Sequence, residues 1–141
     1  MSAPIPPFSI FSAISELFVT AAVFYIVWRN WTRRTFPLPL LITVALFEAL
    51  VNVTYMAARA SRASTGVDTV STGMKTMFAA HGMLSLLAFL AFVVLAVYAW
   101  MDQRNGRWFF RERPALTWAF LLLWTVSIAS GELLFVLRYL V

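Results

Sequence analysis

Apolar residues fill four long stretches of the chain, and polar and charged residues gather in the segments between them. A helix needs about 20 residues, each rising 1.5 Å, to cross a hydrocarbon core of about 30 Å. Each of the four stretches reaches that length, so the pattern predicts four transmembrane helices. The predicted spans are residues 8–28, 38–58, 77–100 and 115–139.

The segments between these spans are too short to form a domain of their own. We therefore predict an all-α fold, with residues 1–141 forming one polytopic transmembrane domain and the four helices packed as an antiparallel bundle. The middle connection, ARASRASTGVDTVSTGMK, is rich in Ala, Ser, Thr and Gly and predicts a surface loop or a short interfacial helix. No basic region precedes the first apolar run, and no small-residue cleavage site follows it, which predicts a permanent span.

The composition agrees with an integral membrane protein. Hydrophobic residues make up 62% of the chain and charged residues 12%, and the mean hydropathy is +0.82, far above the range of soluble domains. The net charge of +5 lies mostly in short connections, which is typical of a topology signal, so no nucleic-acid partner is expected. The chain has no Cys, which excludes disulfides, thiolate metal ligands and cysteine nucleophiles.

The distribution of basic residues predicts the orientation. The first and third connections carry seven arginines, whereas the middle connection carries three basic residues. The positive-inside rule then places both termini outside, and only Arg138 near the C-terminus opposes this assignment. Five tryptophans mark the same inner ends: Trp28, Trp31, Trp100, Trp108 and Trp118. We expect a multi-pass protein of the inner (plasma) membrane of the cell.

Every predicted span carries polar residues whose insertion is unfavourable, by about 2.5–3.5 kcal/mol for an ionisable group. At 1.5 Å per residue, the ionisable groups and Asn52 lie in the outer half of the bilayer, from about 6 Å deep for His81 to about 15 Å for Glu48. No comparable group is expected in the inner half. The predicted polar layer consists of Ser12, Glu16 and Thr20 in the first span, Glu48, Asn52 and Tyr55 in the second, His81 in the third and Glu132 in the fourth.

Three kinds of chemistry fit this layer. Carboxylate oxygens and an imidazole nitrogen bind Fe, Cu or Zn, and the candidate ligands are Glu16, Glu48, His81 and Glu132. The same groups could relay protons, or they could form a hydrogen-bonded seam that fixes the bundle. A Glu-x-x-His di-iron motif is absent, because Phe78 stands three residues before His81. With a single histidine, two-histidine haem ligation within the chain is excluded, and a haem or a metal held by His81 stays open.

The third and fourth spans also carry a family resemblance. They read HGMLSLLAFL from His81, then a loop with Gly106-Arg107-Trp108, then Trp124, six residues, Gly131, and aromatics at Phe135 and Tyr139. This half of the chain resembles the small four-helix membrane proteins of the haem-copper oxidase assembly type (CtaM-like). The resemblance implies a role in oxidase biogenesis, with His81 as the one ligand position carried over. Where that family has further histidines, this chain has TFPLPLL and MDQRNG.

The expected function is that of an accessory or assembly subunit of a respiratory or other redox membrane complex, with its polar layer contacting a partner, a metal or a haem. One alternative is a quinone-facing or proton-relaying subunit. A second alternative is a metal-dependent membrane enzyme that uses Glu16, Glu48, His81 and Glu132. We assign no catalytic residue and expect no activity of the chain on its own, because it has no Cys, no G-x-S-x-G and no second His.

Overall fold

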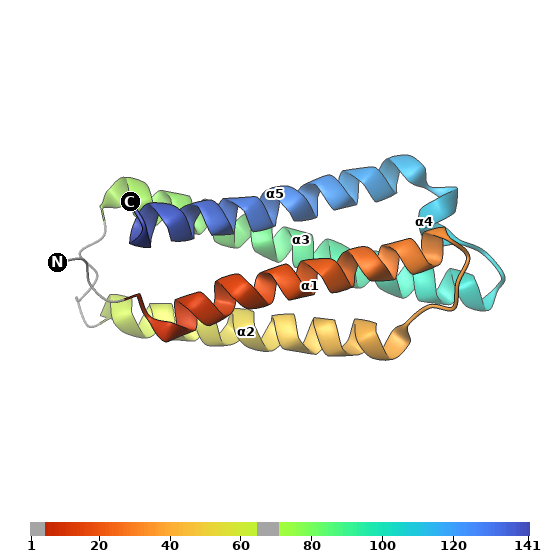
Figure 1. Cartoon of the computed structure of the whole chain (residues 1–141), viewed down its shortest axis with the longest axis horizontal. Coiled ribbons are helices and arrows are strands. Elements are labelled where there is room, and N and C mark those ends of the chain that lie inside the picture. Colours follow the sequence, from red (N-terminus) through yellow and green to blue (C-terminus); the bar gives the residue numbers. More distant parts are fainter. Residues whose placement is uncertain (1–4, 65–70) are drawn as a thin grey trace.

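The computed structural model describes residues 5–64 and 71–141. Within these residues every regular element is a helix, which confirms the predicted all-helical class. Four long helices lie side by side, and one short helix lies at the end of the bundle opposite the start of the first helix and the end of the last (Figure 1). The helices are α1 (Pro7–Trp31), α2 (Leu38–Ser64), α3 (Thr72–Arg104), α4 (Phe109–Glu112) and α5 (Pro114–Tyr139).

The four long helices are each long and apolar enough to cross a membrane. They extend beyond the predicted spans, most of all α3, which begins at Thr72 and ends at Arg104. Hydropathy marks only the part of a helix that suits hydrocarbon, whereas backbone hydrogen bonding continues into the polar flanks. For this reason the predicted middle loop is helical up to Ser64 and again from Thr72, and residues 65–70 lie outside the described part of the chain.

Prolines define where two of the helices start. Pro7 opens α1 and Pro114 opens α5, where the missing N–H would have no partner within the helix. A proline also disfavours helical geometry at the residue before it, and Arg113 has φ −125° and ψ 66°. Arg113 therefore interrupts the helical path and separates α4 from α5.

The short helix α4 lies in a segment that the sequence predicted only as a basic loop. Gly106, with φ of +72°, turns the chain after α3, and Phe110 is then buried between α1 and α5. The backbone N–H of Phe110 donates to Asn30 Oδ1 (3.0 Å), and its carbonyl accepts from Thr117 Oγ1 (2.8 Å). Asn30 and Thr117 are 0% and 2% exposed, so this end also holds buried polar groups, at two positions to which the sequence analysis gave no role.

An aromatic core fills the half of the bundle near α4. Phe92 of α3 lies edge-on to Trp124 of α5, with 5.6 Å between ring centroids, and it stacks on Phe120 at 6.4 Å. Phe110 continues the series from α4, at 6.5 Å from Phe120. Small residues of α3, Ala96 and Ala99, are fully buried and let the helices approach closely. The buried carboxylates and the histidine lie in the other half of the bundle.

Candidate functional site

Side chains from all four long helices surround a small cavity inside the bundle. Glu16 of α1, Glu48 of α2 and His81 of α3 line it, together with side chains of α3 and α5. Its volume is about 10 Å³, roughly the space of one water molecule. Three residues of the predicted polar layer therefore meet around a single small space. The remaining lining residues are Ser85, Ala88, Phe89, Trp124, Ser127 and Ile128.

The imidazole of His81 is held by a hydrogen bond to α5. Nδ1 of His81 lies 2.8 Å from Oγ of Ser130, and the Ser130 hydroxyl donates to the carbonyl of Ser127 at 2.7 Å. Because the Ser130 proton is engaged in that second bond, its oxygen accepts from His81, which places the imidazole proton on Nδ1. Nε2 of His81 is then an acceptor with a free lone pair.

That lone pair lies beside Gly131, close to the carboxylate of Glu16. A β-carbon at position 131 would lie 3.1 Å from Nε2 of His81 and 3.3 Å from Oε2 of Glu16. It would also lie 2.8 Å from Cε1 of His81, closer than β-carbons approach other atoms. The absence of a side chain at Gly131 therefore leaves a space that His81 of α3 and Glu16 of α1 both border.

Glu48 is buried, with 9% of the residue exposed. Asn52, one turn later on α2, donates from Nδ2 to the Glu48 carbonyl at 2.8 Å and to its Oε2 at 3.3 Å. Asn52 thus holds the Glu48 carboxylate from its own helix. Glu48 and Glu132 both lie near enough to Glu16 for a charge on either side chain to act on it, so the three side chains form one group around Glu16.

Glu132 of α5 belongs to this group but does not line the cavity. Its Oε1 is buried and has no hydrogen-bond partner among the described residues. A buried acceptor without a donor is unfavourable by about 1–3 kcal/mol. Oε1 of Glu132 therefore lies where a hydrogen-bond donor would be favourable.

The other predicted residues of the polar layer lie apart from the cavity. Thr20 accepts a 3.1 Å hydrogen bond from Nε1 of Trp124, which ties α1 to α5. Tyr55 stacks on Phe8 with 6.4 Å between ring centroids, and the Ser12 carbonyl accepts from the Ser15 hydroxyl. These three residues support helix packing and local backbone bonding.

Sequence reasoning did not assign a role to Ser130, and it used Gly131 only as a position of the family resemblance. Both belong to the stretch SIASG in α5, whose small residues are the signal that a neighbouring helix comes close. The stretch does not show which residue comes close, because His81 lies 49 positions earlier in the chain than Ser130.

The geometry limits what this site could hold as it stands. In residues 5–64 and 71–141, no three His, Asp or Glu side chains are arranged to hold a metal ion. The nitrogen atom of His81 that could ligate a metal is Nε2. The cavity, at about 10 Å³, is far too small for a haem or a quinone ring. The metal set Glu16, Glu48, His81 and Glu132, and a haem on His81, stay predictions.

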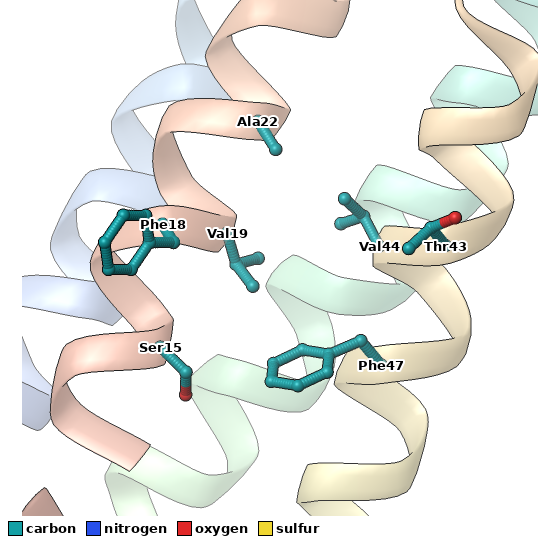
Figure 2. Close-up of a pocket in the computed structure, with 7 residues that line it drawn as sticks. All are labelled: Ser15, Phe18, Val19, Ala22, Thr43, Val44 and Phe47. Carbon is teal, nitrogen blue, oxygen red and sulfur yellow. The ribbon is translucent and has the colours of Figure 1, made fainter. Parts of the chain in front are cut away.

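A second and larger hollow lies between α1 and α2 on the outside of the bundle. Its volume is about 340 Å³, and Figure 2 shows Val19 and Ala22 of α1 and Phe47 of α2 on the facing sides of the two helices. The hydroxyls on this groove are already bonded, since Ser15 donates to the Ser12 carbonyl and Thr43 to the Pro39 carbonyl, both at 2.9 Å. The groove is therefore an apolar surface. Its lining residues are Ser15, Phe18, Val19, Ala22, Thr43, Val44 and Phe47.

Comparison of the chain with protein-family models, with curated proteins and with solved structures finds no match in any of the three.

Proposed function

We propose that this chain is an accessory or assembly subunit of a respiratory or other redox complex in the inner (plasma) membrane. In this proposal the four long helices cross the membrane as an antiparallel bundle with both termini outside. The seven arginines around α4 and the α1–α2 connection support that orientation.

The observation that carries the proposal is the position of the free space in the molecule. The cavity at the buried carboxylates has room for about one water, whereas the α1–α2 groove is more than thirty times larger and faces outward. An enzyme or carrier needs space for its substrate beside its polar groups. This chain instead offers an apolar surface, which is what a subunit needs to pack against a larger membrane protein.

The exposure of α2 supports the same interpretation. In the apolar stretch of α2 only 17% is buried within the chain, against 22–28% in the apolar stretches of the other three long helices. Its outward face carries large apolar side chains at helical spacing. These are Ile42, Leu46, Leu50, Val53 and Met56. In a complex this face and the adjoining groove would contact the partner subunit.

The test uses a strain that lacks the chain and is complemented with variants. Ala22→Trp fills the groove, and Leu122→Trp adds the same bulk on an exposed face of α5 as a matched control. We expect the deletion to lower assembled haem-copper oxidase, measured by the haem absorption of washed membranes and by oxygen consumption. Wild type and Leu122→Trp should restore both, and Ala22→Trp should not. Normal oxidase in the deletion strain would refute the proposal.

The orientation has its own test, because the chain has no Cys. A single cysteine is placed at Asn105, between α3 and α4, or at Thr72, at the start of α3. In intact cells an impermeant maleimide should label the cysteine at position 72 and leave the one at position 105 unlabelled until the membrane is opened. The reverse pattern would invert the proposed topology.

A second candidate is a proton-relaying subunit, and the approach of His81 and Glu16 at Gly131 favours it. A water in the cavity would lie among the free lone pair on Nε2 and the carboxylates of Glu16 and Glu48, which is the arrangement that proton transfer needs. Glu16→Gln and Glu48→Gln should then slow proton uptake by the complex while leaving its assembly intact. If assembly falls instead, the cluster serves the structure.

A further inference from the structure

The end of the bundle that holds α4 carries all of the net charge. We call this the basic end, and it consists of Arg29, Arg33, Arg34, Arg104, Arg107, Arg111 and Arg113 with Asp102 and Glu112. Both carboxylates are already paired, since Asp102 accepts from Arg113 and Glu112 from Arg107, each at 3.2 Å. In the described part of the chain the other five guanidinium groups have no carboxylate partner.

The short helix α4 brings one of these arginines to the end of α1. The bond from the Phe110 N–H to Asn30 Oδ1 fixes α4 against the last turn of α1. The next residue, Arg111, then donates from Nη1 to the carbonyl of Trp31 at 3.4 Å. Arg33 and Arg34 lie two and three positions after Trp31 along the chain, so arginines of two separate segments lie near the end of α1.

The backbone at Arg33 is unusual for an arginine. Its φ is +59°, in the left-handed region that favours glycine. The turn is closed by two hydrogen bonds, from Arg33 N–H to the Asn30 carbonyl (3.1 Å) and from Arg34 N–H to the Arg29 carbonyl (2.8 Å). Helices often end in this way with glycine at the left-handed position. An arginine there adds a positive charge at the expense of a less favourable backbone.

Tryptophans set the depth of these charges. Trp28 is 46% exposed, and the guanidinium of Arg34 lies 4.9 Å from the centre of its ring. Trp118 of α5 is 65% exposed on the same end of the bundle. Indole rings in membrane proteins lie at the level of the lipid headgroups. The arginines beside them are therefore at the level of the phosphates.

We propose that Arg33, Arg34 and Arg111 form a binding site for the phosphate of an anionic phospholipid. Guanidinium groups donate paired hydrogen bonds to phosphate oxygens, and basic pockets at the ends of transmembrane helices bind anionic headgroups. The site needs only that the four helices cross a bilayer, and it does not depend on which complex the chain joins.

The test measures lipid bound to the purified full-length chain. Delipidated protein in detergent is titrated with phosphatidylglycerol or phosphatidylcholine, and bound lipid is counted by native mass spectrometry. We expect phosphatidylglycerol to bind more tightly, and each arginine removed from the site to weaken it about fivefold. Arg33→Gly is the sharpest variant, because glycine suits the turn at this position and only the guanidinium is lost. Arg111→Gln tests the contribution of α4.

Lys75→Gln, which removes one exposed charge near the start of α3, is the matched control. It should leave binding of phosphatidylglycerol within twofold of wild type. An equal loss in Lys75→Gln and Arg33→Gly would mean general attraction of charge and would overturn the site. The site would also be overturned if Arg33→Gly unfolds at the wild-type midpoint and still binds phosphatidylglycerol as tightly as wild type. Inorganic phosphate is added as a competitor, and if it displaces the lipid at similar concentrations, the ligand is a free anion and the lipid proposal is wrong.

Discussion

The backbone N–H of Phe110 donates a hydrogen bond to Oδ1 of Asn30, 80 positions earlier in the chain. Both groups are buried, and the bond joins α4 to α1 at the end of the bundle. We expect Asn30→Ala to lower the free energy of unfolding by about 1–3 kcal/mol, because it leaves the buried Phe110 N–H without an acceptor. The measurement is unfolding in mixed micelles followed by circular dichroism.

Asn105→Ala serves as the control for this change. The exposed side chain of Asn105 donates only to the Met101 carbonyl one turn earlier, so its loss should change stability by less than about 0.5 kcal/mol. If both variants unfold at the same point, the bond between Asn30 and Phe110 does not hold α4 in place.

Gly131→Ala should destabilise the bundle by about 1–3 kcal/mol, since its β-carbon would lie 2.8 Å from Cε1 of His81. Gly82→Ala is the matched control, because a β-carbon there meets no atom within 4 Å. That change should be neutral or stabilising by up to about 1 kcal/mol through helix propensity. In a His81→Ala background the effect of Gly131→Ala should largely vanish, and a double-mutant cycle measures this coupling. Additive effects would show that the two residues do not touch.

Thr20→Val should weaken the bundle by about 0.6 kcal/mol, the average for hydrogen bonds between transmembrane helices, and by no more than about 1.7 kcal/mol, the largest such value. The change removes the acceptor for Nε1 of Trp124 while keeping the shape of the side chain. Thr125→Val is the comparison, because Thr125 is exposed and bonds only to the Leu121 carbonyl one turn earlier. An equal effect of the two changes would point to helix propensity as the cause.

Glu112 gives the basic end a dependence on pH. The hydrogen bond from the Trp108 N–H, followed by the hydrogen bond and charge of Arg107, lowers the pKa of Glu112 below its ordinary value of 4.5. A carboxylate with a lowered pKa in the folded state contributes stability above that ordinary value, and the contribution is lost as the pH falls through the lowered pKa.

Thermal midpoints of wild type and Glu112→Gln should therefore differ slightly at neutral pH and converge in acid, below about pH 4.5. The difference is small because Glu112 is exposed to solvent. A gap that widens on acidification would contradict the assignment of Glu112 as a stabilising carboxylate.

The hydrophobic pattern was sufficient to predict the four long helices, because a membrane span needs a fixed length of apolar chain. It could not predict α4, whose two phenylalanines are too few to show a period. The bend that separates α4 from α5 follows from one local cause, the proline at 114.

Only part of the candidate site could be predicted from the sequence. The predicted polar layer included Glu48 and Asn52, and these two side chains do bond to each other. It also included Glu16 and Thr20, but Thr20 bonds to Trp124 and only Glu16 lines the cavity. Helix rotation depends on packing against neighbours, which spacing along one helix does not contain. Asn30 and Ser130 have partners 80 and 49 positions away, so a single sequence held no sign of them.

The arginines of the basic end, less Asp102 and Glu112, account for the whole net charge of +5, while the other charged residues of the sequence cancel. The bundle is therefore an electric dipole along its long axis. A transmembrane potential acts on such a dipole with about 2.3 kcal/mol per unit charge for each 100 mV. An energised membrane thus favours the orientation with the basic end on its negative side by several kcal/mol, and this preference disappears when the potential collapses.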